Sequence, residues 1–398
     1  MDRWWPQART LGAALVLLGV SACSQSGAMA DMPGSEDTGQ GVEASSSNGS
    51  TGGSTAGDDS LQMRVDAAVP AGLSGGVIVL LVRDGVMSHA VAGTQNAEGE
   101  LLSEDSLFNI ASVSKVYTAT MVYQLVEEGV VDLEAPLTVY LPDTGYGLEV
   151  TIESLLAHRS GIPDYAANPE YLENALLDPD RVFTTEELIG YAAFEDPGPA
   201  GAVFNYSNTG YLLLGLVIES VTGGTLQAAL DARIVEPLSL ASTHYVAPPS
   251  FPEDLPSAWL DPTAFGLPAD TELPVMPVAA ALSGCQADCG IITTAAELRV
   301  FFEGVFDGTL ISSDSLEMMT RSDESPDASG GWGRGLQLYA SANTPEPEYG
   351  HGGAGTGYTS LVSVRPESGD LTIVFASNDR FELDGLLQAY APAVLEGW

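Results

Sequence analysis

Strand-like segments stand at both ends of the folded part of the chain, and mainly helical segments lie between them. The strand-like segments are 75–82, 86–92, 335–340, 359–364 and 371–376. Asp84-Gly85 between the first two is a hairpin signal. This order predicts an α/β fold of the α+β type, in which one antiparallel sheet is formed from N- and C-terminal strands and flanked by helices. The middle of the chain then forms a mainly helical second lobe, with a cleft where the lobes meet.

Helix signals fill the middle of the chain and its end. The expected helices run over 112–128, 151–156, 208–221 and 381–395. Thr184 with Glu187 and Thr294 with Glu297 have the spacing of capping boxes, which mark two further helix starts. Gly129 marks the end of the helix expected over 112–128.

Residues 1–22 have the features of an export signal. Arg3 and Arg9 precede a short apolar run, and Val20-Ser21-Ala22-Cys23 is a small-residue cleavage site. The arrangement resembles bacterial lipoprotein signals, in which the cysteine is lipidated after cleavage. The resemblance implies an exported cell-envelope lipoprotein, anchored through Cys23 and facing the periplasm or the cell exterior. A plain secretory signal with a chance cysteine is the alternative.

Residues 23–60 are expected to be a lipidated cysteine followed by a disordered tether. Residues 24–60 contain no Lys, Arg or His and are dense in Ser, Gly and acidic residues, so they bury too little apolar surface to fold. Residues 61–398 are long enough for one large folded domain. The formal charge of −41 repels phosphates, which disfavours nucleic acid and anionic membrane surfaces as partners.

The chain has a single lysine, Lys115, and the other 12 of its 13 Lys and Arg residues are arginine. Arginine stays protonated in proteins, whereas a lysine amine can give up its proton when it is buried. Ser112 stands three residues before Lys115, so on a helix the two side chains share one face. Ser-x-x-Lys is a pattern in which the amine activates the serine as a nucleophile. At a helix start, the backbone N–H of Ser112 also favours an oxyanion.

Two further pieces have residues suited to acyl transfer. Tyr206 precedes the long apolar helix, and a phenol near an ammonium group can accept a proton. His351-Gly352-Gly353-Ala354 lies just before a terminal strand, where its glycines let an acyl group approach the backbone.

The set Ser112-x-x-Lys115, Tyr206-x-Asn208 and His351-x-Gly353, in this order, resembles the serine β-lactamase and penicillin-binding-protein superfamily. It is most similar to the branch of class C β-lactamases, D,D-peptidases and β-lactamase-like esterases. The stretches 155–163, 208–215 and 290–298 are also similar, so the resemblance covers roughly residues 62 to 398.

The resemblance implies a role for each residue. Ser112 is the nucleophile, Lys115 helps to deprotonate it, and Tyr206 is the general base that passes the proton to the leaving group. Asn208 bonds Lys115 and the substrate amide. The substrate-binding residues also include His351, Gly353 and Ala354, and the N–H groups of Ser112 and Ala354 form the oxyanion hole. No metal or organic cofactor is implied.

His351 departs from the lysine that many relatives have at this place. A histidine with an ordinary pKa of about 6.5 is mostly neutral at pH 7. We therefore expect uncharged short-chain esters or amides to react faster than anionic β-lactams. We also expect anionic substrates to improve as the pH falls through the titration of His351. Arg334, on the neighbouring strand, is a second candidate charge for such substrates.

Cys285 and Cys289 are predicted to form a disulfide, because the chain is expected to be exported. Two cysteines four positions apart on a turn or helix have a Cα–Cα distance near the upper end of the range that a disulfide allows. A zinc site would need two more ligands nearby, so no metal is expected.

The sequence thus predicts a serine hydrolase that acts through an acyl-enzyme on an ester, a β-lactam, or a peptide or amide of a D-amino acid. Its partner is a small-molecule or peptidoglycan-type substrate, and the membrane is reached only through the lipid anchor. A catalytically silent, penicillin-binding-like envelope protein on the same fold is the alternative, and the intact set of motifs argues against it.

Overall fold

The computed structural model describes residues 56–194, 197–201, 203–246, 254–276, 279–322, 331–341, 344–355, 357–392 and 394. The expected signal peptide, Cys23 and the tether up to residue 55 lie outside the described residues.

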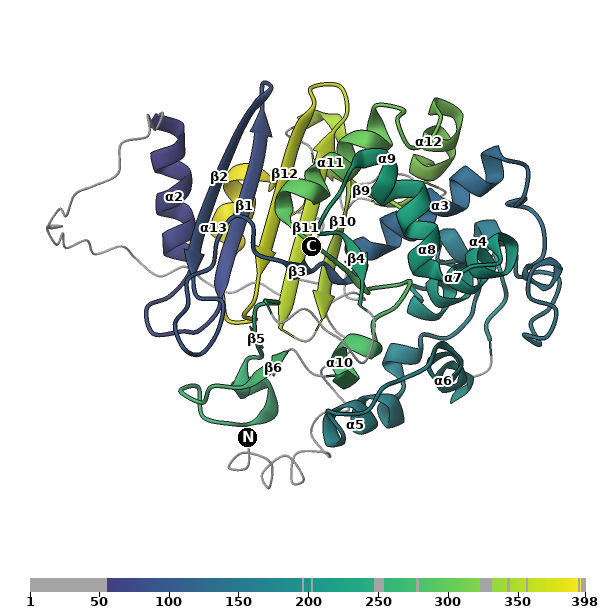
Figure 1. Ribbon diagram of the computed structural model, residues 1–398, viewed down its shortest axis with the longest axis horizontal. Helices are drawn as coiled ribbons and strands as arrows, with labels where there is room; N and C mark the ends of the chain where they lie inside the picture. Colours follow the sequence, from purple (N-terminus) through teal and green to yellow (C-terminus); the bar gives the residue numbers. More distant parts are fainter. Residues whose placement is uncertain are drawn as a thin grey trace, which may run out of the picture.

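A seven-stranded antiparallel sheet brings the two ends of the described chain together (Figure 1). In spatial order its strands are β2 (Val86–Gly93), β1 (Gly76–Arg83), β12 (Asp370–Ala376), β11 (Tyr358–Arg365), β10 (Thr344–Gly355), β9 (Gln337–Ser341) and β8 (Gly331–Trp332). N-terminal β1 pairs with C-terminal β12, with Val77 opposite Ala376. This confirms the predicted sheet of N- and C-terminal strands.

Helices cover both faces of this sheet and form the second lobe. Their bounds are α2 Ala56–Ala68, α3 Ser114–Glu127, α4 Ile152–Leu156, α5 Pro169–Leu177, α6 Thr185–Tyr191, α7 Asn208–Thr222, α8 Leu226–Leu230, α9 Glu236–Leu238, α10 Ala279–Ser283, α11 Ala295–Phe306, α12 Ser313–Thr320 and α13 Asp384–Tyr390. The short strands are β3 Phe108–Asn109, β4 His244–Tyr245, β5 Ala258–Trp259, β6 Pro274–Met276 and β7 Ile291–Thr293. Strands β3, β7 and β4 form one small sheet, and β5 pairs with β6.

Strand β1 is apolar from Val77 to Val82 because these residues are buried on both faces of the sheet. Val77 and Val79 pack with Leu61 of α2 and Leu386 of α13. Ile78, the alternate residue, faces the larger core that α3, α7 and α11 share. Side chains of a strand alternate between the two faces of a sheet, so one strand serves both clusters. Figure 1 shows α2 and α13 together at the β1–β2 end of the sheet.

Helix α2, which comes first in the described part of the chain, was not predicted. Helix α2 starts at Ala56, whereas the folded domain was expected to start at Leu61. Leu61 and Val65 are one turn apart and are both buried against the sheet. This packing stabilises a helix whose sequence has a weak apolar pattern.

Most expected elements are confirmed, and two differ for physical reasons. Thr151 and Thr184 cap α4 and α6 with complete capping boxes. Thr294 caps α11, but the Glu297 carboxylate accepts hydrogen bonds from the 241–243 segment instead of closing the box. The closing helix α13 ends at Tyr390, shorter than the expected 381–395, because Pro392 disfavours helical backbone before it.

Strand β10 was not predicted. The segment around His351 was expected to precede a terminal strand, but it is itself a central strand, with His351 opposite Val362 and Ala354 opposite Thr359. Glycine has low strand propensity, so a run with several glycines gave no strand signal. Gly350 is required there, since a Cβ atom would collide with the carbonyl group of Val362.

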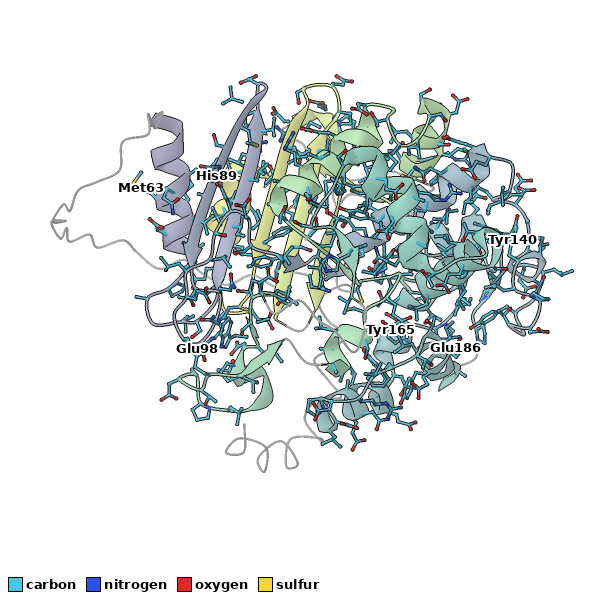
Figure 2. The ribbon with its side chains drawn as sticks, viewed as in Figure 1. Met63, His89, Glu98, Tyr140, Tyr165 and Glu186 are labelled. Carbon is cyan, nitrogen blue, oxygen red and sulfur yellow. The ribbon has the colours of Figure 1, made fainter. Side chains whose placement is uncertain are left out.

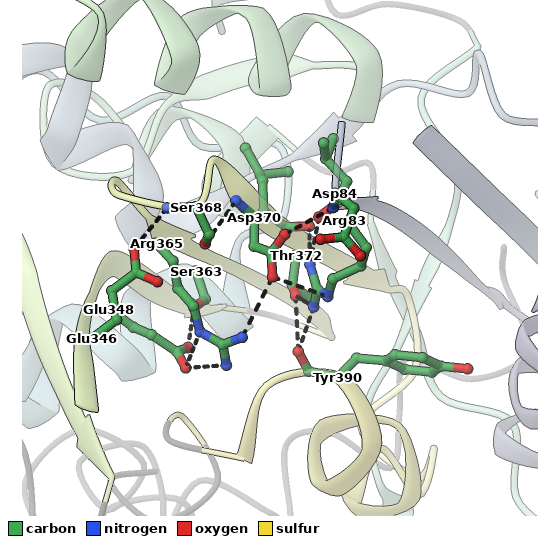
Figure 3. A network of polar contacts seen from close by, with 12 residues as sticks. Arg83, Asp84, Glu346, Glu348, Ser363, Arg365, Ser368, Asp370, Thr372 and Tyr390 are labelled. Atoms are coloured by element: carbon green, nitrogen blue, oxygen red, sulfur yellow. Dashed lines mark hydrogen bonds and ion pairs between the residues drawn. The ribbon is translucent and has the colours of Figure 1, made fainter. Parts of the chain in front are cut away.

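An arginine network ties the last helix to the sheet (Figure 3). The Arg83 guanidinium donates to the carbonyl oxygens of Leu371 at 2.8 Å and Tyr390 at 2.6 Å. Arg365 on β11 forms an ion pair with the buried Glu348 of β10 at 2.5 Å. The N- and C-terminal segments are therefore joined by polar contacts as well as by backbone pairing.

Among the described residues, no single helix has the length and apolar character to cross a membrane. The consecutive pair Asn208–Thr222 and Leu226–Leu238, bent by 77°, meets the length and composition criteria only when its two parts are taken together.

Candidate active site

Ser112 lies in a single 3₁₀ turn, Ala111–Val113, that leads directly into α3. Ala111 adopts a φ of +44°, which is unusual for a residue with a side chain. Its N–H donates to Asn109 Oδ1 at 2.9 Å, and this bond holds the turn in place. A strained residue beside a candidate nucleophile is typical of a functional site. Ser112 itself is 7% exposed.

The ammonium group of Lys115 has three acceptors for its three N–H bonds. Nζ lies 3.2 Å from Ser112 Oγ, 2.6 Å from Asn208 Oδ1 and 2.9 Å from the carbonyl oxygen of Asp288. The side chain is fully buried. An ammonium group donates three hydrogen bonds and accepts none, so this site matches its full donor capacity. Lys115 is therefore fixed against the serine oxygen.

Tyr206 and Asn208 come from the start of α7 and meet Lys115 at the same point. The Tyr206 hydroxyl donates to Ser112 Oγ at 3.0 Å. Ser207 between them caps α7 by accepting the N–H of Gly210, which turns Tyr206 and Asn208 toward the serine. The structure therefore brings together four predicted residues, and the serine oxygen contacts both a lysine amine and a phenol.

Strand β10 passes close to the serine turn. A Cβ atom at Gly353 would lie 2.6 Å from the carbonyl oxygen of Ile110 and 3.1 Å from the backbone nitrogen of Ser112. Only glycine permits this approach. Ala354, the next residue, is exposed. The N–H groups of Ser112 and Ala354 thus come from two adjacent segments, and their joint action as an oxyanion hole stays a prediction.

His351 is buried and neutral. Its side chain is 2% exposed and its ring lies 5.3 Å from Trp332, edge to face. Burial, with a smaller effect of Lys115, lowers the pKa of His351 to about 3. Its Nδ1 lies 2.5 Å from the Gly352 carbonyl oxygen, and Nε2 is buried with no partner among the described residues. The expected titration of His351 near its ordinary value is wrong, because the ring is removed from water beside a cation.

Aromatic side chains form one wall beside the catalytic groups. The His158 ring stacks on Tyr206 at 4.2 Å and meets Trp332 edge to face at 5.4 Å. Phe204 also stacks on Trp332, with the ring centroids 5.4 Å apart. Burial holds the pKa of His158 well below its usual range, and its Nδ1 accepts the N–H of Ser207 at 3.2 Å. This wall is therefore apolar and uncharged.

Arg334 does not serve as a charge for substrates. Its Nε lies 2.6 Å from Glu153 Oε1, and its guanidinium also donates to the Arg321 carbonyl oxygen at 2.7 Å. The residue is 5% exposed. Arg334 thus ties β8 and β9 to α4, and the expectation that it compensates for the missing lysine is wrong.

Two acidic residues in the site were missed by the sequence reasoning. Asp164 contacts Asn208, and Asp288 supplies its backbone carbonyl to Lys115 while its carboxylate accepts from Tyr165 (labelled in Figure 2) at 2.9 Å. Asp164 directly follows the 155–163 stretch, so its position beside a recognised motif was the available signal. Nothing local in the sequence marks Asp288.

Cys285 and Cys289 are free thiols, so the predicted disulfide is wrong. Residues 286–290 form a tight turn, in which the Gln286 carbonyl accepts the N–H groups of Cys289 and Gly290. The Cys289 thiol donates to Asp288 Oδ2 at 3.2 Å, and burial raises its pKa well above the usual value. The Cys289 thiol is therefore held by a hydrogen bond to the Asp288 carboxylate and not by a disulfide bond to Cys285. Within the described ranges, no group of three metal-ligating side chains comes together.

Comparison with known proteins finds related sequences and folds. The family model described as Beta-lactamase matches residues 65–394. Penicillin-binding protein 4 of Amycolatopsis lactamdurans is 30% identical over 315 residues, which cover 74% of this chain and 78% of that protein. Esterase EstB of Burkholderia gladioli is 32% identical over 206 residues, 47% of this chain and 52% of that protein. The crystal structure of a D-stereospecific amidohydrolase from Streptomyces sp. superposes with a TM-score of 0.73 at 26% identity, covering 84% of this chain and 98% of that one.

Proposed function

The chain belongs to the Beta-lactamase family, and from this premise we propose that it hydrolyses uncharged esters or amides through an acyl-enzyme at Ser112. Amides of D-amino acids, and peptides of D-amino acids that carry no free carboxylate, are included in the proposed class. The supporting observation is that Ser112 Oγ accepts hydrogen bonds from both Lys115 Nζ and the Tyr206 hydroxyl.

The contacts support a two-step reaction. The Lys115–Tyr206 pair first releases one proton to solvent, which leaves it able to accept another. Ser112 Oγ then attacks the substrate carbonyl carbon as its own proton moves to this pair. The bond to the alcohol or amine leaving group then breaks, and Tyr206 returns the proton to that group. In the second step a water molecule attacks the acyl carbon by the same route and frees Ser112. Backbone N–H groups beside β10 stabilise the oxyanion in both steps.

Two neutral substrate classes have support from different relatives. One relative is named an esterase and one structural neighbour a D-stereospecific amidohydrolase. In this chain, Lys115 Nζ already has three acceptors, Arg334 is paired with Glu153, and His158 and His351 are neutral. None of these four side chains offers a positive charge to a substrate carboxylate, whereas the aromatic wall suits an apolar acyl or leaving group.

The test compares three acyl donors: a nitrophenyl ester, an N-acetylated D-amino-acid anilide and a chromogenic cephalosporin. We expect a higher kcat/KM for the neutral ester or anilide than for the anionic cephalosporin. Because His351 stays neutral, the ratio of cephalosporin to ester rates should be constant between about pH 5.5 and pH 8.5. A ratio that rises as the pH falls through about 6.5, or a cephalosporin that is the fastest substrate, would contradict this proposal.

We also propose that the protein is exported and anchored by a lipid on Cys23. The support is the run of features in residues 1–23, which resembles a lipoprotein signal. In cells fed a labelled fatty acid, we expect the full-length chain to carry the label and the Cys23→Ser variant to lose it. An unlabelled parent that is released from membranes by salt alone would rule out the anchor.

A further inference from the structure

The Asp164 carboxylate receives three backbone and side-chain donors at the edge of the catalytic group. Oδ1 accepts the N–H of Ala166 at 3.1 Å and the N–H of Asn208 at 3.3 Å. Oδ2 accepts from Asn208 Nδ2 at 3.0 Å. Asp164 thus holds both the backbone and the side-chain amide of Asn208.

The amide of Asn208 stands between a group that only accepts and a group that only donates. An ionised carboxylate has no proton to donate, and an ammonium group has no lone pair. The NH₂ end must therefore face Asp164, and the oxygen must face Lys115, where Oδ1 lies 2.6 Å from Nζ. A continuous chain of contacts runs from Asp164 through Asn208 and Lys115 to Ser112 Oγ.

We propose that Asp164 is a positioning residue, which fixes the Asn208 amide and through it the Lys115 amine, and which sets the acid limit of the reaction. This inference rests on the proposed hydrolase function. Without a carboxylate at this place, the amide can rotate and turn its NH₂ end toward the ammonium group. Lys115 would then lose its shortest hydrogen bond and its fixed direction toward Ser112.

The charge of Asp164 depends on pH within a measurable range. Removal from water raises the pKa of Asp164 to about 6. The charge of Asp288 also raises this pKa, whereas the charge of Lys115 lowers it. Lys115 comes from α3, Asp288 from the turn before β7, and Tyr171 from α5 also senses this carboxylate. Above about pH 6 the carboxylate is charged and holds the amide. Below it, a proton occupies an oxygen that must accept, so the rate falls with falling pH.

Titration of the two histidines of the site does not cause this fall in rate at low pH, which we call the acid limb. The pKa of His351 is about 3, and the pKa of His158 lies well below its usual range. Asp379 offers a matched control, because burial also raises its pKa to about 6, while the charge that acts on it is that of Asp261. Its backbone N–H donates to the Trp259 carbonyl oxygen. Asp379→Asn removes a carboxyl group with the same titration range and leaves the Asp164 contacts in place.

The experiment measures kcat/KM for a nitrophenyl ester from about pH 5 to pH 8 for the parent, Asp164→Asn, Asp164→Glu and Asp379→Asn. We expect Asp164→Asn to be about ten- to a hundredfold slower at neutral pH and to lose the acid limb near pH 6. Asp164→Glu should keep a limb, and Asp379→Asn should keep both the rate and the limb. An Asp164→Asn enzyme with the parental rate and limb would overturn the proposal.

A double-mutant cycle separates positioning from a general effect on folding. In the Asn208→Ala background, Asp164→Asn should change the rate less than about twofold, because the amide through which it acts is gone. A loss as large as in the parent background would overturn the proposal. If Asp164→Asn fails to fold, the cycle is run with Asp164→Glu, to which the same criterion applies. Failure of the proposed function would look different, since the parent itself would then form no acyl adduct at Ser112.

Discussion

Replacing Ser112 with alanine is expected to lower kcat/KM for every acyl donor by about ten-thousandfold or more. The acyl group in the proposed mechanism is carried by the serine oxygen, and the Lys115 amine and the Tyr206 phenol both point at that oxygen. Alanine leaves them with nothing to activate. The residual rate would come only from substrate binding and backbone N–H groups.

Ser114→Ala is the matched control for this experiment. Ser114 lies two residues further on, is fully buried, and its hydroxyl oxygen accepts the N–H of Ile291 at 3.0 Å. Its loss should lower stability by about 1–3 kcal/mol, since a buried donor is left unpaired, but acylation should persist. If Ser112→Ala turned over substrate at the parental rate, the mechanism would be wrong.

Replacing Lys115 with arginine is expected to be almost as damaging as replacing it with alanine, about a thousandfold in the acylation rate. Arginine keeps the positive charge, but it does not give up a proton near neutral pH. Its planar guanidinium also does not match three acceptors placed around one nitrogen atom, namely Ser112 Oγ, Asn208 Oδ1 and the Asp288 carbonyl.

Arg233→Lys exchanges the same two residue types elsewhere and serves as the control. Arg233 forms a surface ion pair with Glu128 at 2.8 Å, so this change should leave the acylation rate unaltered. Should Lys115→Arg retain most of the parental acylation rate, Lys115 would act only through its charge, and the proton transfer proposed for it would be excluded.

The predictable parts of the fold are those with local signals. The hairpin of β1 and β2 has a turn dipeptide, and Thr151 and Thr184 have their capping partners three residues on. Strand β10 carries no such signal, because its glycines serve close packing against Ser112 and the neighbouring strand rather than strand propensity. Long-range packing determines that segment, and a single sequence does not display it.

The candidate site divides in the same way. Ser112, Lys115, Tyr206 and Asn208 were predicted because their spacing forms motifs, and the structure places them in contact. Asp164 was missed because its partner Asn208 is 44 residues away in the chain. The neutrality of His351 was underestimated, because its burial depends on elements that are distant in sequence.

The central claim is that Ser112 carries the acyl group, and acyl-peptide mapping tests it most directly. The parent is mixed with a nitrophenyl ester, quenched with acid during the first turnovers and digested with trypsin, which cuts after Arg83 and after Lys115, the single lysine of the chain. We predict that fragmentation of the 84–115 peptide places the acyl mass on Ser112 and that Ser112→Ala shows no adduct. An acyl group on any other residue, with full turnover in Ser112→Ala, would contradict the account.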